Sequence, residues 1–506
     1  RKMELLGLLS DGFLVAFEPL NLGLIVLGVV VGLFVGAMPG LGSVNGVAIL
    51  LPMTFLVPPA SAIIFLAALY YGAMYGGAIS SIALGIPGAS TAVATTFDGR
   101  PLAMQGEADK ALIAAALASF AGGTISVILF TLFAPPLASI ALDFGDPEIF
   151  ALMILAFATF VGLSGDDIAK TIFSICIGMV MSAIGFDIIS GEPRLVLFDL
   201  IGFQSKINFL VLAIGIYGIG EMMWTIEVSR GETMMSKVTL SVDRVMSNLK
   251  IIWGTWKAWF MGSILGFFVG ILPAAGATPG SLMAYGVAKM TSREPHMFGK
   301  GAVEGVVAPE AANNAASTGS LLPMLTLGIP GSPTTAVLLG GMVIWGLQPG
   351  PRLFVTETEF VWGLIASLYA ANLFAVIINI AFIPLFLWFL KTPFTILAPL
   401  IFVLSMVGGY AATERMFDVW LMLILGVGGY LMRKLDYPVA PAVLAIVLGP
   451  IAEPALRQSL LISSGDVMVF VNRPIAGPIT IIALVLLFMP AFQAMWRRVR
   501  GKPAAG

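Results

Sequence analysis

The chain has almost none of the residues that build disulfides, soft-metal sites or soluble surfaces. Its 506 residues include one cysteine, Cys176, and one histidine, His296. A disulfide within the chain is therefore impossible, and neither a zinc-type site nor a catalytic His/Cys cluster has enough ligands. Charged residues make up 11% of the sequence, whereas a soluble domain carries about 25%. There is also no phosphate-binding P-loop pattern, which argues against a built-in ATPase.

Apolar runs interrupted by glycine and proline dominate the sequence instead. Hydrophobic residues are 58% of the chain, and runs long enough to cross a bilayer, roughly 20 residues, recur from end to end. This predicts an all-α polytopic membrane protein with roughly 10 to 14 transmembrane or re-entrant helices. The predicted apolar spans are 20–37, 45–57, 60–84, 110–142, 147–163, 167–190, 206–226, 256–272, 280–290, 318–348, 360–390, 393–411, 416–432, 438–450 and 475–495.

The sequence repeats itself in the same order in its two halves. The stretch "VVGLFVGAMPGLG" aligns with "ILGFFVGILPAAG", so that Pro39 falls on Pro273, 234 residues later. Leu-Gly-Ile-Pro-Gly occurs at 84–88 and again at 327–331, 243 residues later, each time followed by Ser and Thr. Because the separation drifts only slowly, the matches predict an internal duplication. Duplicated halves with Gly/Pro-interrupted spans at matching places are typical of secondary transporters. Whether the halves are inverted or parallel depends on the number of crossings in the first half, and the inverted relation is favoured.

The predicted organisation follows from the repeat and from the charges that flank it. The Lys and Arg residues of "WRRVRGK" near the end of the chain place the C-terminus on the cytoplasmic side. The predicted segments are an N-terminal interfacial amphipathic helix (1–19), a first transmembrane repeat (20–226), a polar, cytoplasmic linker (227–255), a second transmembrane repeat (256–450), and a C-terminal segment (451–506) with a loop, a last transmembrane helix and a basic cytoplasmic tail.

The repeated Gly/Pro motifs are predicted breaks in membrane helices. Gly and Pro are poor residues for a continuous helix, and backbone freed from helix bonds costs several kcal/mol per group in hydrocarbon. Such breaks are tolerated only inside the protein or beside a water-filled cavity, so the two breaks are expected to meet near the bilayer midplane. The backbone N–H groups at helix N-termini beside the breaks suit an anion. The backbone carbonyls of the unwound segments, together with hydroxyl groups, suit a small cation such as Na⁺. No Lys or Arg lies inside the break motifs, so neutral donors would hold a carboxylate.

The breaks and the polar stretch "APEAANNAASTGS" supply the candidate site. Glu310 is expensive in an apolar surrounding and is read as functional, although after Pro309 it could also cap a helix start. Any single Ser or Thr could instead bond its own backbone. The alignment pairs Asn313 and Asn314 with Tyr70 and Tyr71. The predicted substrate- and ion-binding residues are Pro39, Gly40, Gly42, Ser43, Asn45, Gly85, Pro87, Gly88, Ser90, Thr91, Glu310, Asn313, Asn314, Ser317, Thr318, Gly328, Pro330, Gly331, Ser332 and Thr334.

These long motifs resemble the large (TctA-type) membrane subunit of tripartite tricarboxylate transporters. The resemblance extends from Leu20 to Pro490 and rests on "GAMPGLGSVNGVAILLPMTF", "YGGAISSIALGIPGASTAVATTFDGRPLAMQG", "FGDPEIFALM", "APEAANNAASTGSLLPMLTLGIPGSPTTAVLLGG" and "GLQPGPRLF". It implies a multi-pass protein of the bacterial inner membrane that works with a small membrane subunit and a periplasmic substrate-binding protein. It also implies import of carboxylates such as citrate and other di- and tricarboxylates by secondary active symport.

The resemblance implies no cofactor or metal, but a coupling cation, Na⁺ or H⁺. The family's Pro-Gly motifs fall on residues 39–42, 85–88 and 328–331, and its Glu-Ala-Ala-Asn-Asn motif on 310–314. A standalone Na⁺- or H⁺-coupled organic anion carrier is the alternative. A channel is less favoured, because the sequence has no visible ring of charge or continuous polar pore, and no motif suggests an enzyme.

Overall fold

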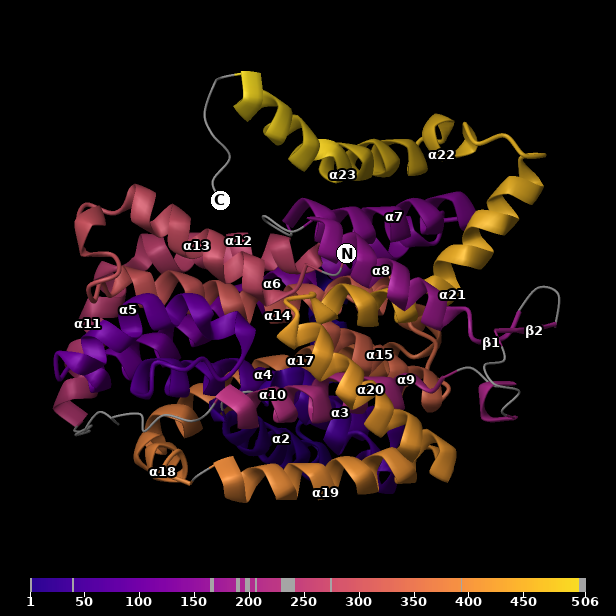
Figure 1. Cartoon of the computed structure of the whole chain (residues 1–506). Helices are drawn as coiled ribbons and strands as arrows, with labels where there is room; N and C mark the ends of the chain where they lie inside the picture. Colours follow the sequence, from indigo (N-terminus) through magenta and orange to yellow (C-terminus); the bar gives the residue numbers. More distant parts are fainter. Residues whose placement is uncertain are drawn as a thin grey trace.

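The computed structural model (Figure 1) describes residues 2–38, 41–163, 168–187, 192–195, 201–204, 207–228, 242–273, 275–392 and 394–499. Up to residue 254 its elements are α1 (Lys2–Ala16), α2 (Pro19–Ala37), α3 (Gly42–Leu50), η1 (Pro52–Leu56), α4 (Pro59–Ala83), η2 (Ser90–Ala92), α5 (Val93–Met104), α6 (Ala108–Ala141), α7 (Asp146–Leu163), α8 (Ile168–Ser182), β1 (Gly185–Phe186), β2 (Pro193–Arg194), η4 (Ile201–Gln204), α9 (Phe209–Ala213), the π-helical turn η5 (Ile214–Ile219), α10 (Gly220–Val228) and α11 (Val242–Gly254). The remaining elements are α12 (Trp256–Ile271), α13 (Ala277–Thr291), η6 (Pro295–Met297), α14 (Glu304–Leu327), α15 (Pro333–Ile344), α16 (Leu353–Thr356), α17 (Thr358–Ala381), α18 (Ile383–Phe389), α19 (Phe394–Thr413), α20 (Met416–Lys434), α21 (Val439–Ile462), α22 (Val469–Asn472) and α23 (Ala476–Val499).

The predicted all-α membrane architecture is confirmed. Among the described residues, six helices are long and apolar enough to cross a bilayer, and seven shorter apolar helices accompany them. The six are α2, α4, α6, α17, α20 and α21. The expected breaks are also present, because α4 ends at Ala83 and α14 ends at Leu327, before the two Ile-Pro-Gly corners.

One predicted span is wrong in its boundaries. The sequence predicts a span over 318–348, whereas α14 begins at Glu304 and ends at Leu327, and α15 begins at Pro333 after the break. Hydropathy missed the first half of α14 because that half carries the polar run from Glu310 to Thr318. These side chains are fully buried in the protein and do not lie at a membrane edge.

Rows of glycine bring two pairs of helices into backbone contact. On α2, a methyl group placed on Gly28, Gly32 or Gly36 would lie 2.5, 2.2 or 2.1 Å from a carbonyl oxygen of α4. On α12, the matching residues Gly262, Gly266 and Gly270 would lie 2.4, 2.2 and 2.3 Å from carbonyl oxygens of α14. Each pair of glycines is separated by 234 residues, the separation found in the sequence. Only glycine allows this close helix packing, so the repeated contacts explain the repeated residues.

Helices α4 and α14, which the alignment also pairs, run antiparallel at the centre of the molecule. Asn313 Nδ2 donates to the Met74 carbonyl oxygen (3.3 Å), Tyr71 bonds Thr318, and Tyr70 bonds Ser320 (3.3 Å). As the residue number rises on α14, it falls on α4. The two aligned helices therefore pass each other in opposite directions.

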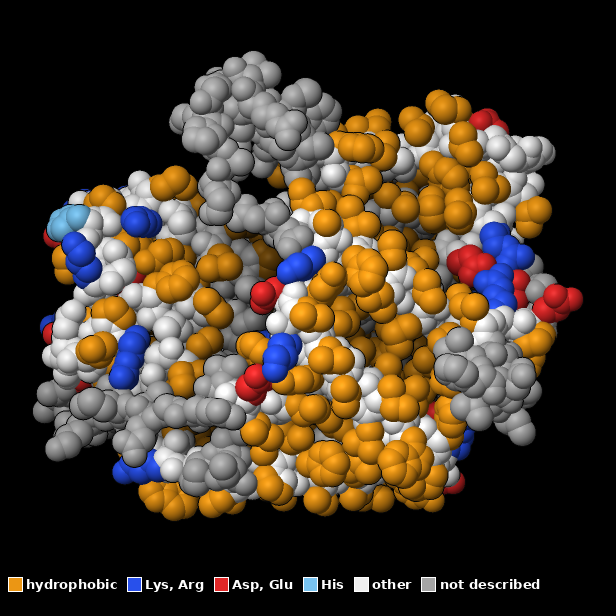
Figure 2. Space-filling view, in the orientation of Figure 1, with side chains coloured by type: hydrophobic (Ala, Val, Ile, Leu, Met, Phe, Trp, Pro, Cys, Tyr) orange, Lys and Arg blue, Asp and Glu red, His pale blue; other side chains and the backbone are white. Residues whose placement is uncertain are grey.

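The outer helices present apolar surface. Along α20, Trp420, Ile424 and Leu431 are exposed, at the spacing of one helix face, and α19 exposes Leu400 and Val407. Figure 2 shows hydrophobic side chains covering most of the face formed by the helices from α19 to α23. In Figure 1, α23 lies along α7 at the top of the view and α19 forms the lower edge. In a polytopic membrane protein such a face is the surface that lipid covers.

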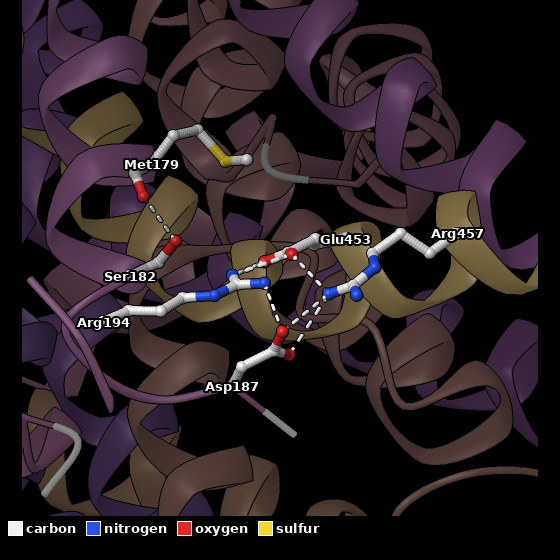
Figure 3. Close-up of polar contacts among 6 residues, drawn as sticks. All are labelled: Met179, Ser182, Asp187, Arg194, Glu453 and Arg457. Carbon is white, nitrogen blue, oxygen red and sulfur yellow. Dashed lines mark hydrogen bonds and ion pairs between the residues drawn. The ribbon is translucent and has the colours of Figure 1, made fainter. Parts of the chain in front are cut away.

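An ion-pair cluster fastens the β1–β2 hairpin to α21 (Figure 3). The Arg194 guanidinium lies 2.6 Å from Asp187 Oδ2 and 2.8 Å from Glu453, and Arg457 lies 2.9 Å from Asp187 Oδ2. Hydrogen bonds that Arg194 donates to Glu453 and Asp187 raise the pKa of Arg194 above its usual value. The charges of these two carboxylates and two guanidiniums cancel, so the four side chains connect the hairpin to α21 without adding a net charge.

Three predicted segments are only partly described. Helix α1 ends at Ala16, and residues 17 and 18 form the turn into α2. It packs on α17, where a methyl on Gly12 would lie 2.3 Å from the Trp362 carbonyl oxygen. The polar linker contains α11, and its residues 229–241 lie outside the described ranges. The last residues of the basic tail, 500–506, also lie outside them. The domain boundaries stay predictions.

Candidate functional site

The two breaks and the two re-entrant helix starts form one connected group, here called the four-start ring. Its members are the starts of α3 (Gly42, Ser43), η2 (Ala89, Ser90), α13 (Gly276, Thr278) and α15 (Ser332, Thr334). Within each half, a methyl on Gly42 would lie 3.5 Å from Ala89 Cβ, and one on Gly276 would lie 3.8 Å from Ser332 Cβ. Residues 42 and 89 correspond to 276 and 332 at the separations of 234 and 243 residues found in the sequence.

Two cross-links between the halves close the ring. Ser43 Oγ and Thr334 Oγ1 are 2.9 Å apart, and Thr278 Oγ1 donates to Ser90 Oγ at 3.3 Å. Each re-entrant helix start therefore bonds the break of the opposite half. The free N–H groups at such starts carry partial positive charge, which suits an anion. The geometry matches the expectation that the breaks converge.

Left-handed glycines shape the breaks. Gly42 and Gly276 have φ of +62° and +68°, and Gly85 and Gly328 have φ of +75° and +71°. Any other residue would be strained there. Behind each corner, a methyl on Gly88 would lie 1.9 Å from the Gly36 carbonyl oxygen, and one on Gly331 would lie 2.6 Å from that of Gly270. These glycines set the path of the backbone and offer no side-chain ligand.

One side of the ring is buried and rich in hydroxyl groups. Ser332 caps α15 by accepting from the Thr335 backbone N–H at 3.2 Å, while Thr335 Oγ1 accepts from the Ser332 N–H. Tyr70 of α4 lies 3.3 Å from both Ser332 and Ser320. We call Tyr70, Tyr71, Ser320, Ser332 and Thr334 the hydroxyl pole; it contains no charged side chain. It offers neutral hydrogen-bond donors beside a helix start.

The other side of the ring is near a buried carboxylate. Glu310 is fully buried on α14 and accepts hydrogen bonds from Thr95 of α5 and from Ser119 of α6, the latter at 3.2 Å. Both of these partners are neutral. We call Glu310, Asn313, Asn314, Thr95 and Ser119 the carboxylate pole.

Other buried carboxylates are neutralised or capped in the usual ways. Glu148 pairs with Arg473 at 2.6 Å, and Asp418 lies 3.5 Å from Arg415. Asp98 Oδ1 accepts three backbone N–H bonds at 2.8 Å and its Oδ2 accepts from the Tyr285 hydroxyl at 2.9 Å. Glu310 has no such cation or N–H cradle among the described residues, which makes it the exception in this core.

The two poles lie at different positions along α14. Ser320 and Glu310 are separated by ten residues of α14, or about 15 Å along a helix that rises 1.5 Å per residue. The sequence predicts a single site, and the structure separates its side chains into these two groups. Within the carboxylate pole, Asn314 Nδ2 donates to the Glu310 carbonyl oxygen at 3.2 Å, and the Oδ1 atoms of Asn313 and Asn314 are buried without a hydrogen-bond partner.

The predicted residues have different positions relative to these groups. Ser317 bonds the Asn314 carbonyl oxygen of its own helix, as mid-helix serines often do. Pro39 and Gly40 lie outside the described residues. Thr91 lies next to the ring, and its carbonyl oxygen accepts from Ser281 at 2.9 Å. Thr318 bonds Tyr71 and Ser126, and Asn45 is buried on α3. The residues in the ring or its poles are Gly42, Ser43, Ser90, Glu310, Asn313, Asn314, Ser332 and Thr334, and those that form the corners are Gly85, Pro87, Gly88, Gly328, Pro330 and Gly331.

Sequence reasoning missed several polar partners. Tyr75 donates to Asn372 Oδ1 at 2.6 Å, and Asn372 Nδ2 donates to Thr124 at 3.0 Å. A lone asparagine in the apolar span of α17 was a usable signal, because polar residues inside membrane spans are expensive. Ser119 and Ser126 gave no signal, since serine is common in Ala/Gly-rich helices that pack closely. Among the described residues, no group of His, Cys, Asp and Glu could hold a metal ion.

Comparison with known proteins identifies the family of the chain. The model of the tripartite tricarboxylate transporter TctA family matches residues 22–444. The chain belongs to the TctA family. Two relatives of this TctA protein come from Agrobacterium vitis: a 52.8 kDa protein in the TAR-I ttuC′ 3′ region, 36% identical over 97% of this chain and 98% of its own length, and a protein in the TAR-II ttuC′ 3′ region, 38% identical over 45% of this chain and 96% of its own. Neither name states an activity, and no solved structure matches.

Proposed function

We propose that this TctA protein is the translocating subunit of a tripartite transporter that imports small carboxylates, such as di- and tricarboxylates, across the bacterial inner membrane. A periplasmic binding protein delivers the acid, a small membrane subunit completes the complex, and a gradient of Na⁺ or H⁺ drives the uptake. Family membership supports a transport role. The substrate, the partners and the coupling ion are the proposed part.

The observation that carries the proposal is the four-start ring. Helix starts from both halves meet in it, and each break bonds the opposite half through Ser43–Thr334 or Thr278–Ser90. A carboxylate bound there contacts both halves at once, so its binding and release are linked to their relative position. Neutral donors without Lys or Arg hold the anion weakly enough for release.

Inverted halves fit the same proposal. The antiparallel course of α4 and α14 and the matched glycine rows support them. Exchange of two inverted arrangements moves a central site from one side of the membrane to the other without moving the acid far.

Uptake into vesicles tests the proposal. Vesicles containing this chain and its small subunit take up a labelled panel of di- and tricarboxylates, with or without the binding protein and with a Na⁺ or a pH gradient. We expect uptake that needs both the binding protein and a cation gradient. Uptake without the binding protein would instead identify a standalone organic anion carrier, and gradient-independent flux would identify a channel.

The variants Ser43→Ala and Thr334→Val test the ring itself. Each removes one partner of the buried cross-link, so we expect uptake to fall by about tenfold or more, the factor that corresponds to about 1.4 kcal/mol. Ser139→Ala on α6 is the control, because this exposed serine bonds only its own helix among the described contacts. Full uptake in both ring variants would remove the ring from the transport path.

A further inference from the structure

We propose that the duplicated site has diverged, and that its carboxylate pole is a Na⁺ site formed by Glu310, Asn313 and Asn314, separate from the acid-binding hydroxyl pole. This inference rests on the proposed transport function, because it assigns the coupling ion of that function to particular side chains. It is carried by the position of these residues in the repeat and by buried oxygen atoms that lack partners.

The repeat shows where the halves differ. At the separation of 243 residues, Glu310, Asn313 and Asn314 correspond to Ala67, Tyr70 and Tyr71. The tyrosines bond Ser332, Ser320 and Thr318 at the hydroxyl pole. The same two helical positions therefore carry phenols at one pole and amides beside a carboxylate at the other. Hydroxyl donors suit an anion, whereas a carboxylate with amide oxygens suits a cation.

The carboxylate pole has unsatisfied acceptors. Asn313 and Asn314 are fully buried, and the Oδ1 atom of each lacks a hydrogen-bond partner. Both residues lie one turn after Glu310, at the i+3 and i+4 positions that share its helix face. Asn314 Nδ2 donates to the Glu310 carbonyl oxygen at 3.2 Å, and Asn313 Nδ2 donates to the Met74 carbonyl oxygen of α4 at 3.3 Å. Orphaned buried acceptors are costly, so they indicate a ligand that accepts their lone pairs.

The charge of the ligand follows from the surroundings of Glu310. Its described partners, Thr95 and Ser119, are neutral, so an ionised carboxylate there lacks a countercharge. One monovalent cation balances one carboxylate. A proton would neutralise Glu310 but leave both amide oxygens unpaired, whereas Na⁺ coordinates all of these oxygens together with the Thr95 and Ser119 hydroxyls.

The site is connected to the first break. Thr95, which bonds Glu310, lies on α5 directly after η2, and the Thr91 carbonyl oxygen of η2 accepts from Ser281 of α13. A cation that draws Glu310 and Thr95 together therefore fixes the start of α5 relative to α14. Through this contact, Na⁺ binding acts directly on the position of the first break in the four-start ring.

Equilibrium binding of ²²Na⁺ to the purified chain in lipid nanodiscs tests the site without any transport step. Choline chloride keeps the ionic strength constant. We expect saturable binding in the unaltered chain, and at least a tenfold loss of affinity in Glu310→Gln and in Asn314→Ala. Glu148→Gln, a buried carboxylate that pairs with Arg473, and Asn379→Ala, a buried amide on α17 whose Oδ1 also lacks a partner, should bind Na⁺ normally.

The outcomes separate the site from the function. Absence of Na⁺ binding in the unaltered chain overturns the inference, as does unchanged affinity in Glu310→Gln. Should Glu310→Gln fail to fold, as judged by gel filtration, Glu310→Asp keeps the charge and is expected to bind Na⁺ with weakened affinity; unchanged affinity there, together with unchanged affinity in Asn314→Ala, also overturns it. Na⁺ binding without any carboxylate uptake in vesicles would remove the proposed function and leave the cation site in place. Na⁺-independent uptake driven by a pH gradient would leave transport in place and remove the Na⁺ site.

Discussion

The matched glycine rows make a quantitative prediction about how the helices within each half are held together. In Gly32→Ala the new methyl group lies 2.2 Å from the Leu69 carbonyl oxygen, whereas ordinary contact begins at 3.4 Å. Helices α2 and α4 must therefore separate locally by about 1 Å, and overpacking of this size costs about 1–3 kcal/mol. Gly266→Ala meets the Ala312 carbonyl oxygen at the same distance of 2.2 Å. We expect the two variants to lose similar amounts of stability.

The assay is the free energy of unfolding in detergent micelles, measured by steric trapping. Gly23→Ala, on the open face of α2 with no neighbour within 4 Å, is the control for the first half, and Gly286→Ala on α13 is the control for the second. Alanine favours helix over glycine by about 1 kcal/mol, so both controls should be neutral or slightly more stable than the unaltered chain. Equal stability of Gly32→Ala and Gly23→Ala would refute the close backbone contact. A loss at Gly32 without a loss at Gly266 would refute the structural equivalence of the halves.

Three further perturbations follow from single contacts. Gly328→Ala forces alanine into the left-handed end of α14, with φ of +71°, and should cost about 1–2 kcal/mol of unfolding free energy, while Gly328→Asn should cost less. Asp98→Ala leaves the backbone N–H groups of residues 299, 301 and 302 without their acceptor, at about 1–3 kcal/mol for each group that water does not reach, and should speed protease cleavage of the loop before α14. Asp187→Asn removes a charge that Arg194 and Arg457 share, so the unfolding temperature should fall at low salt and the difference from the unaltered chain should shrink at high salt.

The sequence predicted the helices well wherever they are apolar on most sides. The spans predicted over 60–84 and 110–142 agree within two residues with α4 and α6. The breaks were predictable too, because Gly and Pro exclude a continuous helix whatever the surroundings. Helix α14 was not, because its polar residues point into the protein and its hydropathy resembles that of a loop. Sequence periodicity reports which face is polar, but not whether that face meets water or another buried polar face.

The partners of the site residues depend on tertiary contacts that no local pattern encodes. Thr95 and Ser119 meet Glu310 from two other helices, more than 190 residues away in the sequence. The resemblance to the family pointed to Glu310 and the two asparagines, and the structure adds which hydroxyls surround them. It also separates Glu310 from Ser320 of the hydroxyl pole by about 15 Å along α14. A single list of site residues could not contain that distinction.

The matched glycines explain why the backbone was easier to predict than the chemistry. Gly32 and Gly266 must both be glycine, because in each half a helix backbone fills the place of a side chain. The side chains beside the breaks face no such constraint, so Glu310 could arise opposite Ala67 without disturbing the fold. A symmetric pair of sites would bind the same ligand twice, whereas a transporter that couples an acid to a cation needs two different sites in contact with the same moving elements. Under the proposed function, the matched glycines keep the backbones of the two halves alike, and the unequal poles let the acid and the cation bind at different places.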